Sequence, residues 1–465
     1  MYTRKILAYF WRLLVISHQR QPVVREIALK ALYNVEIRKA VPQESLHTLF
    51  HRYSFSDRDK ALATEIVYGS IRWRRRLDWI LGRLMRGNPE SLTPWIRQII
   101  RMGLYQLIMM NQIPDSAATD ESVKLARRYG HEGTVRLTNA IMRNAIRKRK
   151  EFEKPECRDN PIEEMGITYS YPTWLIKRWI ERYGTEGAEN LMKAGNKVPP
   201  LTIRVNTDRI SPKVLVSRLR DHGIQVEPSR WFSDFVSMRH RGDPRQLPYY
   251  DEGLFQIQDE STGLAVHLLN PQPGETIVDL CCAPGGKTTY IAQFVCAEGY
   301  VVACDISLRR LNQVEENRRR LGLSQLHIIA MDGSLLALEA GVDRVIVDAP
   351  CSGLGTIARK PDIRWRRSVE DFQRFHALQL KLLENGAALV KKGGLLVYST
   401  CTIEPEENED VVSEFCNRQP EFHLEKPVDW PNEISEVMDF EGKVKTLPSI
   451  HGVDGIFAVR LRRDV

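Results

Sequence analysis

Cysteine is scarce in this 465-residue chain, and its few cysteines are not spaced as metal ligands usually are. There are 8 of them, with no pair separated by two residues and no cluster of cysteine with histidine. This pattern excludes a disulfide framework and disfavours a zinc site, whose ligands come in closely spaced pairs. We therefore expect a protein of the reducing cytoplasm that binds no metal.

Long apolar runs, internal repeats and low-complexity tracts are also missing. From Gln21 onward no stretch approaches the roughly 20 apolar residues that a membrane span needs. The stretch from Ile6 to Ile16 is apolar, but Arg12 interrupts it and no small-residue cleavage site follows. Residues 1–21 are therefore expected to form an N-terminal extension and not a signal peptide. No long exposed apolar helix face stands out, which predicts a monomer without a membrane partner.

Acidic residues are scarce in the first third of the chain. Residues 1–150 hold 28 basic and 12 acidic residues, a charge of +16, whereas the whole chain carries +8 and the remainder therefore −8. A basic domain joined to a mildly acidic one favours a polyanionic partner, held mainly by the first domain and processed by the second. The alternative is a set of arginine-rich helix faces that only contact water.

The chain is long enough for two or three domains, and the first is predicted to be all-helical. Between residues 22 and 150 apolar residues recur at intervals of three and four, as at Ile96, Ile99, Ile100, Leu104 and Leu107. Prolines and polar clusters divide this region into about six or seven helices. A linker and a small α+β segment are expected over residues 151–255, with a strand at 201–205, a helix at 212–222 and a further strand.

Residues 256–465 are predicted to form an α/β domain with a Rossmann-like sheet. Short apolar runs alternate with helical patterns, and the runs lie at residues 276–280, 300–304, 327–330, 345–347 and 395–398. This alternation indicates a mainly parallel sheet with helices on both faces. A final run over 455–461 follows a helix that begins near Glu406, and is expected to add a strand at the end of that sheet.

A glycine-rich turn follows the first of these strands, where open α/β sheets bind their ligands. It consists of Cys281, Cys282, Ala283, Pro284, Gly285, Gly286 and Lys287. The turn is not a triphosphate loop, because Cys281 stands where that loop has its first glycine, and it lacks the spaced glycines of dinucleotide sites. Asp305, after the second strand, is placed to bind ribose hydroxyls, and Asp332, after the third, to reach an adenine amine. Each aspartate could instead only cap the helix that follows it.

Cys351 and Cys401 each close a predicted strand at this same edge of the sheet. A thiolate that adds to C6 of cytosine makes C5 nucleophilic enough to take an electrophilic methyl group, after which a base removes the C5 proton and the cysteine leaves. The order of the two thiols does not decide which one attacks. Asp348 precedes Cys351 by three residues and is placed to hydrogen-bond the cytosine edge, unless it only caps the strand end.

The remaining cysteines receive a plainer interpretation. A lone cysteine at a strand end is usually a small apolar residue, and this interpretation is given to Cys157, Cys296, Cys304 and Cys416. Cys351 and Cys401 differ from them because both lie in polar, turn-like segments at the catalytic edge. The pair therefore predicts covalent chemistry on an electron-poor ring.

The motifs around these residues resemble those of the bacterial Sun/Fmu methyltransferases of the RsmB/NOP family, which methylate a cytosine C5 in 16S ribosomal RNA. The likeness covers nearly the whole chain from Val23. It is carried by residues 281–287, 348–351, 359–365, 398–401 and 404–409, and in the first domain by residues 55–60, 76–79 and 103–107. Cys282 departs from the alanine expected in the family.

The resemblance implies a class I S-adenosylmethionine-dependent methyltransferase domain after a NusB-like, RNA-binding helical domain. It implies that Cys401 is the nucleophile at C6 and that Cys351 assists release of the methylated base. It also implies cofactor contacts from the turn at 281–287 and from Asp305, Asp332 and Asp348. Cytosine-5 DNA methyltransferases attack with the cysteine of their Pro-Cys pair instead. The roles given to the two thiols therefore rest on the family resemblance and not on their spacing.

The basic residues of the first domain are candidates for contacts with RNA phosphates. They are Arg72, Arg74, Arg75 and Arg76, with Trp73 as a stacking or packing residue, and the run Arg147, Lys148, Arg149 and Lys150. Two other functions remain open: the same chemistry on transfer RNA, and a catalytically silent RNA-binding factor of ribosome assembly or antitermination. The paired thiols argue against the silent factor, because a scaffold has no need of them.

Overall fold

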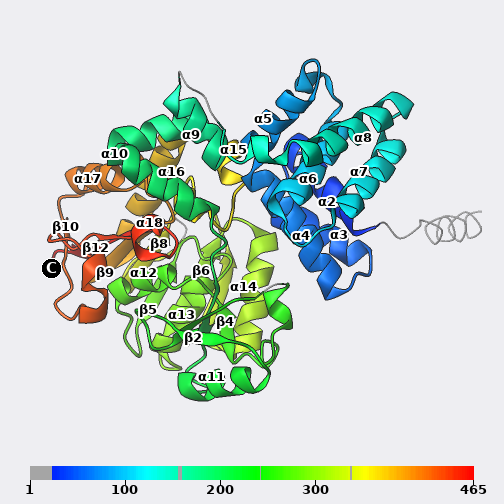
Figure 1. Cartoon of the computed structure of the whole chain (residues 1–465). Coiled ribbons are helices and arrows are strands. Elements are labelled where there is room, and N and C mark those ends of the chain that lie inside the picture. The colour runs from blue at the N-terminus through cyan, green and yellow to red at the C-terminus, as the bar shows by residue number, and fades with distance from the viewer. Residues whose placement is uncertain (1–22, 156–159, 241, 336–337) are drawn as a thin grey trace, which may run out of the picture. The chain divides into compact units, whose positions relative to one another are not determined.

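The computed structural model describes residues 23–155, 160–240, 242–335 and 338–465, and divides the chain into two compact units. The first unit extends to Ser170 and the second runs from Tyr171 to Val465 (Figure 1). The expected N-terminal extension at residues 1–21 and Cys157 lie outside the described residues. Along the part of the chain that is described, no helix is long and apolar enough to cross a membrane.

The first unit is helical, as the three- and four-residue periodicity predicted. Its helices are α2 (Val24–Ile37), α3 (Pro42–Arg52), α4 (Asp57–Arg72), α5 (Arg74–Leu84), α6 (Pro94–Met109), α7 (Asp115–Tyr129), α8 (Glu132–Arg147) and α9 (Pro161–Tyr169). Helix α6 packs against α2, α4, α5, α7 and α8, because its apolar residues at 96, 99, 100, 104 and 107 are all buried. Thr93 caps its first turn by accepting a hydrogen bond from the backbone N–H of Ile96.

The second unit opens with the long helix α10 (Thr173–Asn196) and a four-stranded antiparallel sheet. The strands are β1 (Leu201–Val205), β2 (Val226–Pro228), β3 (Phe235–Met238) and β4 (Phe255–Ile257), in the order β2-β3-β1-β4, and helix α11 (Pro212–Asp221) precedes β2. The predicted strand at 201–205 is confirmed. The predicted helix ends one residue earlier than expected, with His222 as its C-cap.

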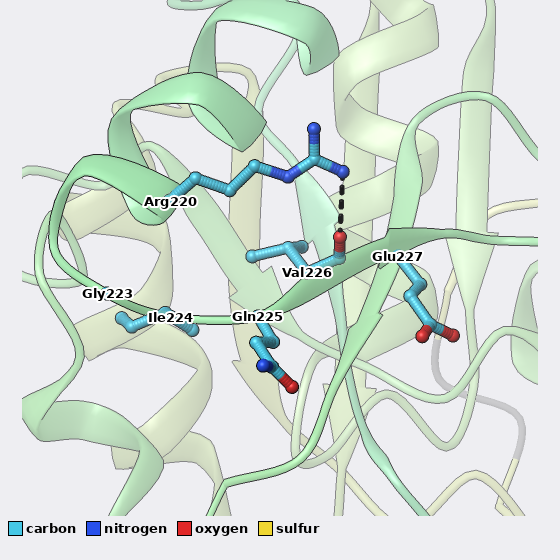
Figure 2. Close-up of a pocket in the computed structure, with 6 residues that line it drawn as sticks. All are labelled: Arg220, Gly223, Ile224, Gln225, Val226 and Glu227. Atoms are coloured by element: carbon cyan, nitrogen blue, oxygen red, sulfur yellow. Dashed lines mark hydrogen bonds between the residues drawn. The ribbon is translucent and has the colours of Figure 1, made fainter.

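A surface pocket lies at the turn between α11 and β2 (Figure 2). It is lined by Arg220, Gly223, Ile224, Gln225, Val226 and Glu227, and the Arg220 guanidinium donates a hydrogen bond of 3.0 Å to the backbone carbonyl of Val226. None of the residues singled out in the sequence lines this pocket, so the candidate chemistry lies elsewhere in the unit.

The strands that precede Cys351 and Cys401 belong to a larger, mixed sheet with the strand order β10-β12-β9-β8-β5-β6-β7. Its strands are β5 (Thr276–Asp279), β6 (Tyr300–Asp305), β7 (Leu326–Ala330), β8 (Val342–Asp348), β9 (Val390–Thr400), β10 (Phe422–Leu424) and β12 (Phe457–Arg463), and β11 (Val444–Lys445) pairs with β12. The five strands from β5 to β9 are parallel, as predicted, whereas β12 runs antiparallel to β9. The expected last strand is present, but its predicted place at the end of the sheet is wrong: it lies between β9 and β10, because it pairs antiparallel with both.

Helices cover both faces of this sheet, because successive strand residues point to opposite sides. Helices α12 (Ser261–Leu269), α13 (Gly286–Val295) and α14 (Leu308–Leu321) pack on the face that carries Ile277 and Ile346. Helices α16 (Glu370–Leu389) and α17 (Glu409–Arg418) pack on the face that carries Val278, Val345 and Val347. The Rossmann-like fold class is confirmed. The strand order reverses beside β5, and a ligand site is expected at the carboxyl ends of the strands there.

Candidate active site

Cys351 and Cys401 lie side by side at the carboxyl edge of this sheet. Asp348, the last residue of β8, is in register with Ser399 of β9, so the loops that leave these two strands start together. The two sulfur atoms are 3.3 Å apart, and the backbone N–H of Cys401 donates to the Cys351 sulfur at 3.3 Å. Both side chains keep some exposure to solvent. The structure thus brings together the two thiols that the sequence analysis paired.

The surroundings make the two thiols unequal. A hydrogen bond from Cys351 lowers the pKa of Cys401 to about 7 against the effect of burial, and the ammonium groups of Lys360 and Lys287 lower it further. The pKa of Cys351 is raised instead, by the hydrogen bond to Cys401, by burial and by the nearby Glu407 carboxylate. When one thiol of the pair ionises, these groups favour the thiolate on Cys401 and the proton on Cys351.

Lys287 and Asp348 form an ion pair beside these thiols. The Lys287 ammonium lies 2.7 Å from the Asp348 carboxylate, which also accepts a hydrogen bond of 2.9 Å from the Ser399 hydroxyl. Burial alone would lower the pKa of Lys287, but the Asp348 charge and hydrogen bond raise it, so the ammonium stays charged. The sequence analysis placed Lys287 only in the cofactor turn. Its link to Asp348 was missed, because the helix α13 that carries it approaches β8 only in three dimensions.

The glycine-rich turn connects β5 to the N-terminus of α13. Gly285 adopts φ 101°, a left-handed conformation that disfavours residues with a Cβ, and this allows the turn to enter the helix directly. Asp279 accepts hydrogen bonds from the backbone N–H of Cys281 (3.2 Å) and from the Thr288 hydroxyl (2.6 Å). Burial raises the pKa of Asp279 to about 7. The turn is therefore held from both its strand side and its helix side.

Asp305 is the last residue of β6 and Asp332 follows the neighbouring strand β7, as expected. The Asp305 carboxylate accepts from the backbone N–H groups of Ala283 (3.2 Å) and Ser307 (2.9 Å), which joins it to the glycine-rich turn. Asp332 accepts from the backbone N–H and the hydroxyl of Ser334. Neither aspartate caps a helix, because Ser307 is the N-cap of α14 and the next described element after Asp332 is strand β8.

Large apolar side chains near these aspartates are open to solvent. Ile306 is 72% exposed, Leu308 70% and Leu335 65%, although such residues are usually buried. A flat apolar ring beside Asp305 and Asp332 would cover such surface, so this environment fits the adenosyl part of S-adenosylmethionine. The sequence analysis did not single out these residues, although an apolar residue directly after a candidate aspartate, as Ile306 is after Asp305, can be recognised in the sequence.

The first group of basic candidates, in the first unit, is largely engaged in intramolecular contacts. Arg72 is only 5% exposed, and burial lowers the pKa of Arg74. Arg75 forms an ion pair of 2.5 Å with Glu163, and Arg76 donates to the backbone carbonyls of residues 152, 153 and 168 while its guanidinium lies 5.9 Å from the Trp73 ring. These contacts account for the four arginines within the unit, and a role in RNA binding stays a prediction for them.

The run at residues 147–150 is more open. Arg147 and Lys150 are exposed, whereas Lys148 pairs with Glu151 at 3.1 Å and Arg149 with Asp115 at 2.5 Å. Both ion pairs lie at the surface, where such pairs are weak and exchange easily for other anions. Of the predicted phosphate contacts, this run is the one that the structure leaves accessible.

Comparison with known proteins assigns the chain to a family. The family model described as 16S rRNA methyltransferase RsmB/F matches residues 266–462. A relative from Bacillus subtilis (strain 168), named probable ribosomal RNA small subunit methyltransferase B, is 34% identical over 451 residues, which cover 95% of this chain and 98% of the relative. The chain belongs to the RsmB/F family of 16S rRNA methyltransferases.

Other similarities support each domain of this RsmB/F protein. The NusB family model matches residues 22–147, and a model of the ferredoxin-like domain of RsmF/B-like methyltransferases matches residues 171–243. The ribosomal RNA small subunit methyltransferase B of Photorhabdus laumondii is 33% identical over 94% of this chain and 100% of the relative. A solved structure of a methyltransferase homologue from Pyrococcus horikoshii is 30% identical, with a TM-score of 0.56 over 65% of this chain and 99% of that one. The NusB-like first domain and the small α+β insert are thereby confirmed.

The other cysteines of this RsmB/F protein lie in varied settings. Cys304 is buried at the end of β6, Cys416 is half-buried on α17, and Cys296 is exposed after α13. Within the described ranges, no group of three histidine, cysteine or acidic residues is arranged to hold a metal ion. Cys282 is buried with Ala283, so the residue that departs from the family pattern packs inward, and burial raises the pKa of its thiol.

Proposed function

We propose that this RsmB/F family member methylates C5 of a cytosine in 16S ribosomal RNA through a covalent bond between Cys401 and C6 of the base. The observation that carries the proposal is the unequal thiol pair: two sulfur atoms 3.3 Å apart, with the pKa of Cys401 lowered to about 7 and that of Cys351 raised. A thiolate is the form that attacks carbon, so Cys401 is the nucleophile.

Asp348 is the group proposed to hold the cytosine. Its carboxylate lies at the end of β8, three residues before Cys351, and is 32% exposed although it is paired with Lys287. A carboxylate can accept hydrogen bonds from the exocyclic amine and from N3 when that nitrogen carries a proton. Such contacts favour the ring in which C6 has gained an electron pair from sulfur, since charge then builds up on the N3 side. The base must be turned out of its stack, because C6 is attacked from the face of the ring.

S-adenosylmethionine, when bound, supplies the electrophilic methyl group that C5 takes up. We assign its binding to the turn at 281–287, to Asp305 at the ribose hydroxyls, to Asp332 at the adenine amine and to Asp348 near the methionine part. The exposed apolar residues Ile306 and Leu335 would then pack against the adenine. These assignments follow the order of the strands that carry the residues.

Cys351 is proposed to assist the release of the product. When the C5 proton is removed, its electron pair restores the C5–C6 double bond and the bond from C6 to the Cys401 sulfur breaks. The departing thiolate needs a hydrogen-bond donor, and the Cys351 thiol is in contact with that sulfur. A cysteine kept protonated by its raised pKa is suited to this role.

The test is transfer of labelled methyl from S-adenosylmethionine to unmodified 16S RNA by the wild type, Cys401→Ala and Cys351→Ala, followed by denaturing gels and nucleoside mass spectrometry. We expect 5-methylcytidine from the wild type, no transfer by Cys401→Ala, and a protein–RNA adduct that persists with Cys351→Ala. The opposite behaviour of the two variants would exchange their roles. Transfer only to transfer RNA, or tight RNA binding without any transfer, would support the alternative functions.

A further inference from the structure

A buried polar cluster behind the two thiols is not used by the chemistry described so far. We propose that Gln379, Glu407 and Asn408 form a positioning frame that holds the two sulfur atoms in contact and makes the two thiols unequal. This proposal rests on the proposed function only for its consequence in methyl transfer. None of the three side chains is expected to touch the base or the cofactor, so they are positioning residues and not catalytic ones.

The frame forms hydrogen bonds with the backbone on both sides of Cys351. The amide N–H of Gln379 donates to the backbone carbonyl of Pro350 at 2.9 Å, and the backbone N–H of Ser352 donates to the Glu407 carboxylate at 2.7 Å. Gln379 also donates to that carboxylate at 3.1 Å, so the hydrogen bonds to Pro350 and to Ser352 are connected. The residues directly before and after the thiol are therefore tied to one rigid pair of side chains.

The frame also forms hydrogen bonds with the residues on both sides of Cys401. The Thr400 hydroxyl donates to the Asn408 side chain at 2.6 Å, and the Asn408 amide donates to the backbone carbonyl of Thr402 at 3.1 Å. A further hydrogen bond of 2.8 Å joins the hydroxyls of Ser352 and Thr402. Because Glu407 and Asn408 are neighbours in sequence, the positions of the two thiol loops depend on one another.

Burial shows that this arrangement is costly to build. Gln379 and Glu407 have no exposed surface and Asn408 only 3%. Three polar side chains, one of them ionisable, lose their hydration there, and the contacts described above replace it only in part, because Gln379 Oε1 and Glu407 Oε1 have no hydrogen-bond partner among the described residues. The residues that these side chains hold are the ones that flank each thiol: Pro350 and Ser352 around Cys351, and Thr400 and Thr402 around Cys401.

The charge of Glu407 also acts on one thiol more than on the other. It contributes to raising the pKa of Cys351, while Lys287 and Lys360 act on Cys401 in the opposite direction. The other charged groups that act on Cys401 are Asp348, from β8, and Asp454, from the loop before β12. Glu407 behind Cys351 and the lysines around Cys401 thus determine which of the two thiols stays protonated.

The experiment compares the full-length wild type with Glu407→Gln, which keeps an oxygen acceptor for Ser352 but removes the charge. Glu414→Gln is the control, because Glu414 lies at the surface of α17 and pairs with His376 and Arg418. Each protein is treated with iodoacetamide over a range of pH, without RNA or cofactor, and alkylation of Cys351 and Cys401 is quantified separately by peptide mass spectrometry.

We expect wild type and Glu414→Gln to be alkylated first at Cys401, with an inflection near pH 7. In Glu407→Gln the ratio of Cys351 to Cys401 alkylation at neutral pH should rise about tenfold, which corresponds to about one pKa unit. An unchanged ratio in a folded Glu407→Gln protein would overturn the proposal. Methyl transfer by the wild type is measured in parallel: its absence together with a shifted ratio would reject the proposed function and keep the frame.

A second variant covers the case in which Glu407→Gln does not fold. Gln379→Met preserves the side-chain volume but removes the donor to Pro350 and to Glu407. The readout is formation of a Cys351–Cys401 disulfide by diamide, a reaction in which the two thiols give two electrons and two protons to the diazene. Disulfide formation should slow about tenfold or more when the sulfur atoms are no longer held in contact. A rate equal to that of the wild type would contradict the frame.

Discussion

At the scale of single residues, Cys351 and Cys401 show that one residue type performs two tasks when its environment differs. Both follow a strand of the same sheet, yet the pKa of one thiol is lowered and that of the other is raised. The direction depends on neighbours that come from α13, from the loop with Lys360 and from Glu407. Reactivity at this site is therefore a property of the surroundings, and it can be tested one residue at a time.

The pH dependence of methyl transfer should report the Cys401 thiol. Its pKa in the folded protein is lowered to about 7, so the active thiolate is present above pH 7 and is lost as the pH falls through that value. We expect single-turnover transfer to rise tenfold per pH unit below about pH 7 and to level off above it. In Cys351→Ala the inflection should move upward, because the donor that stabilises the thiolate is gone. An inflection that stays in place would contradict the hydrogen bond from Cys351.

Lys287→Met should disable the site more than it unfolds the protein. The substitution removes the partner of Asp348 and one of the cations that lower the pKa of Cys401. We expect the transfer rate constant to fall by roughly 10²-fold or more, as is typical when a group that stabilises developing charge is lost. The control is the exposed Lys392→Met. A change confined to cofactor affinity would show that Lys287 serves the turn alone.

At the scale of elements, tight turns and one long helix position the site. Gly285→Ala places a Cβ at φ 101° in the cofactor turn, which costs about 1 kcal/mol of folding free energy. Gly274→Ala is the matched control, because Gly274 also has positive φ (81°) and open space around it, but lies before β5. Both variants should lose similar stability in urea unfolding. Only Gly285→Ala should weaken S-adenosylmethionine binding in calorimetry.

Helix α10 holds the loop that follows Cys401. Arg178 pairs with both Glu404 and Glu406, and the Trp179 indole N–H donates to Glu404 at 3.1 Å, although Glu404 has no exposed surface. We expect Arg178→Ala to lower the free energy of unfolding by about 2 kcal/mol, because a buried carboxylate loses a charged donor. The surface variant Arg418→Ala should cost less than about 1 kcal/mol. An equal loss of unfolding free energy in the two variants, measured in urea titrations, would show that the contacts of Glu404 stabilise the fold no more than a surface ion pair does.

At the scale of the whole molecule, charge is divided between the parts of the chain. Residues 1–150 carry +16 and the remainder −8, and Arg147 and Lys150 are exposed at the end of the NusB-like helices. The double variant Arg147→Glu, Lys150→Glu should weaken RNA binding at all sequences and reduce the slope of log affinity against log salt by about 2. Binding is measured at several salt concentrations. The same loss from Lys213→Glu, Arg218→Glu on α11 would show that the basic unit is not the main contact.

Many of the helices and strands could be predicted from the sequence, because they depend on local residue patterns. The helical period of residues 96–107, the strand at 201–205 and the apolar runs of the large sheet all agree with the structure, since burial of one helix stripe or of both strand faces leaves a direct mark on the sequence. The antiparallel insertion of β12 beside β9 left no such mark. Strand direction is decided by which neighbour the chain meets after folding.

The sequence by itself determined the fold class, the glycine-rich turn and the presence of two thiols at one sheet edge, because each strand, its end and the turn that follows it are formed by consecutive residues. Only the tertiary structure decided that the sulfur atoms are 3.3 Å apart, that Lys287 pairs with Asp348, and that Gln379 and Glu407 support the loop of Cys351. These contacts join residues between 29 and 61 positions apart, so their distances depend on packing of the sheet and its helices. Hydrogen bonds and charges act over a few ångströms in space, and that is where the reactivity of this site is set.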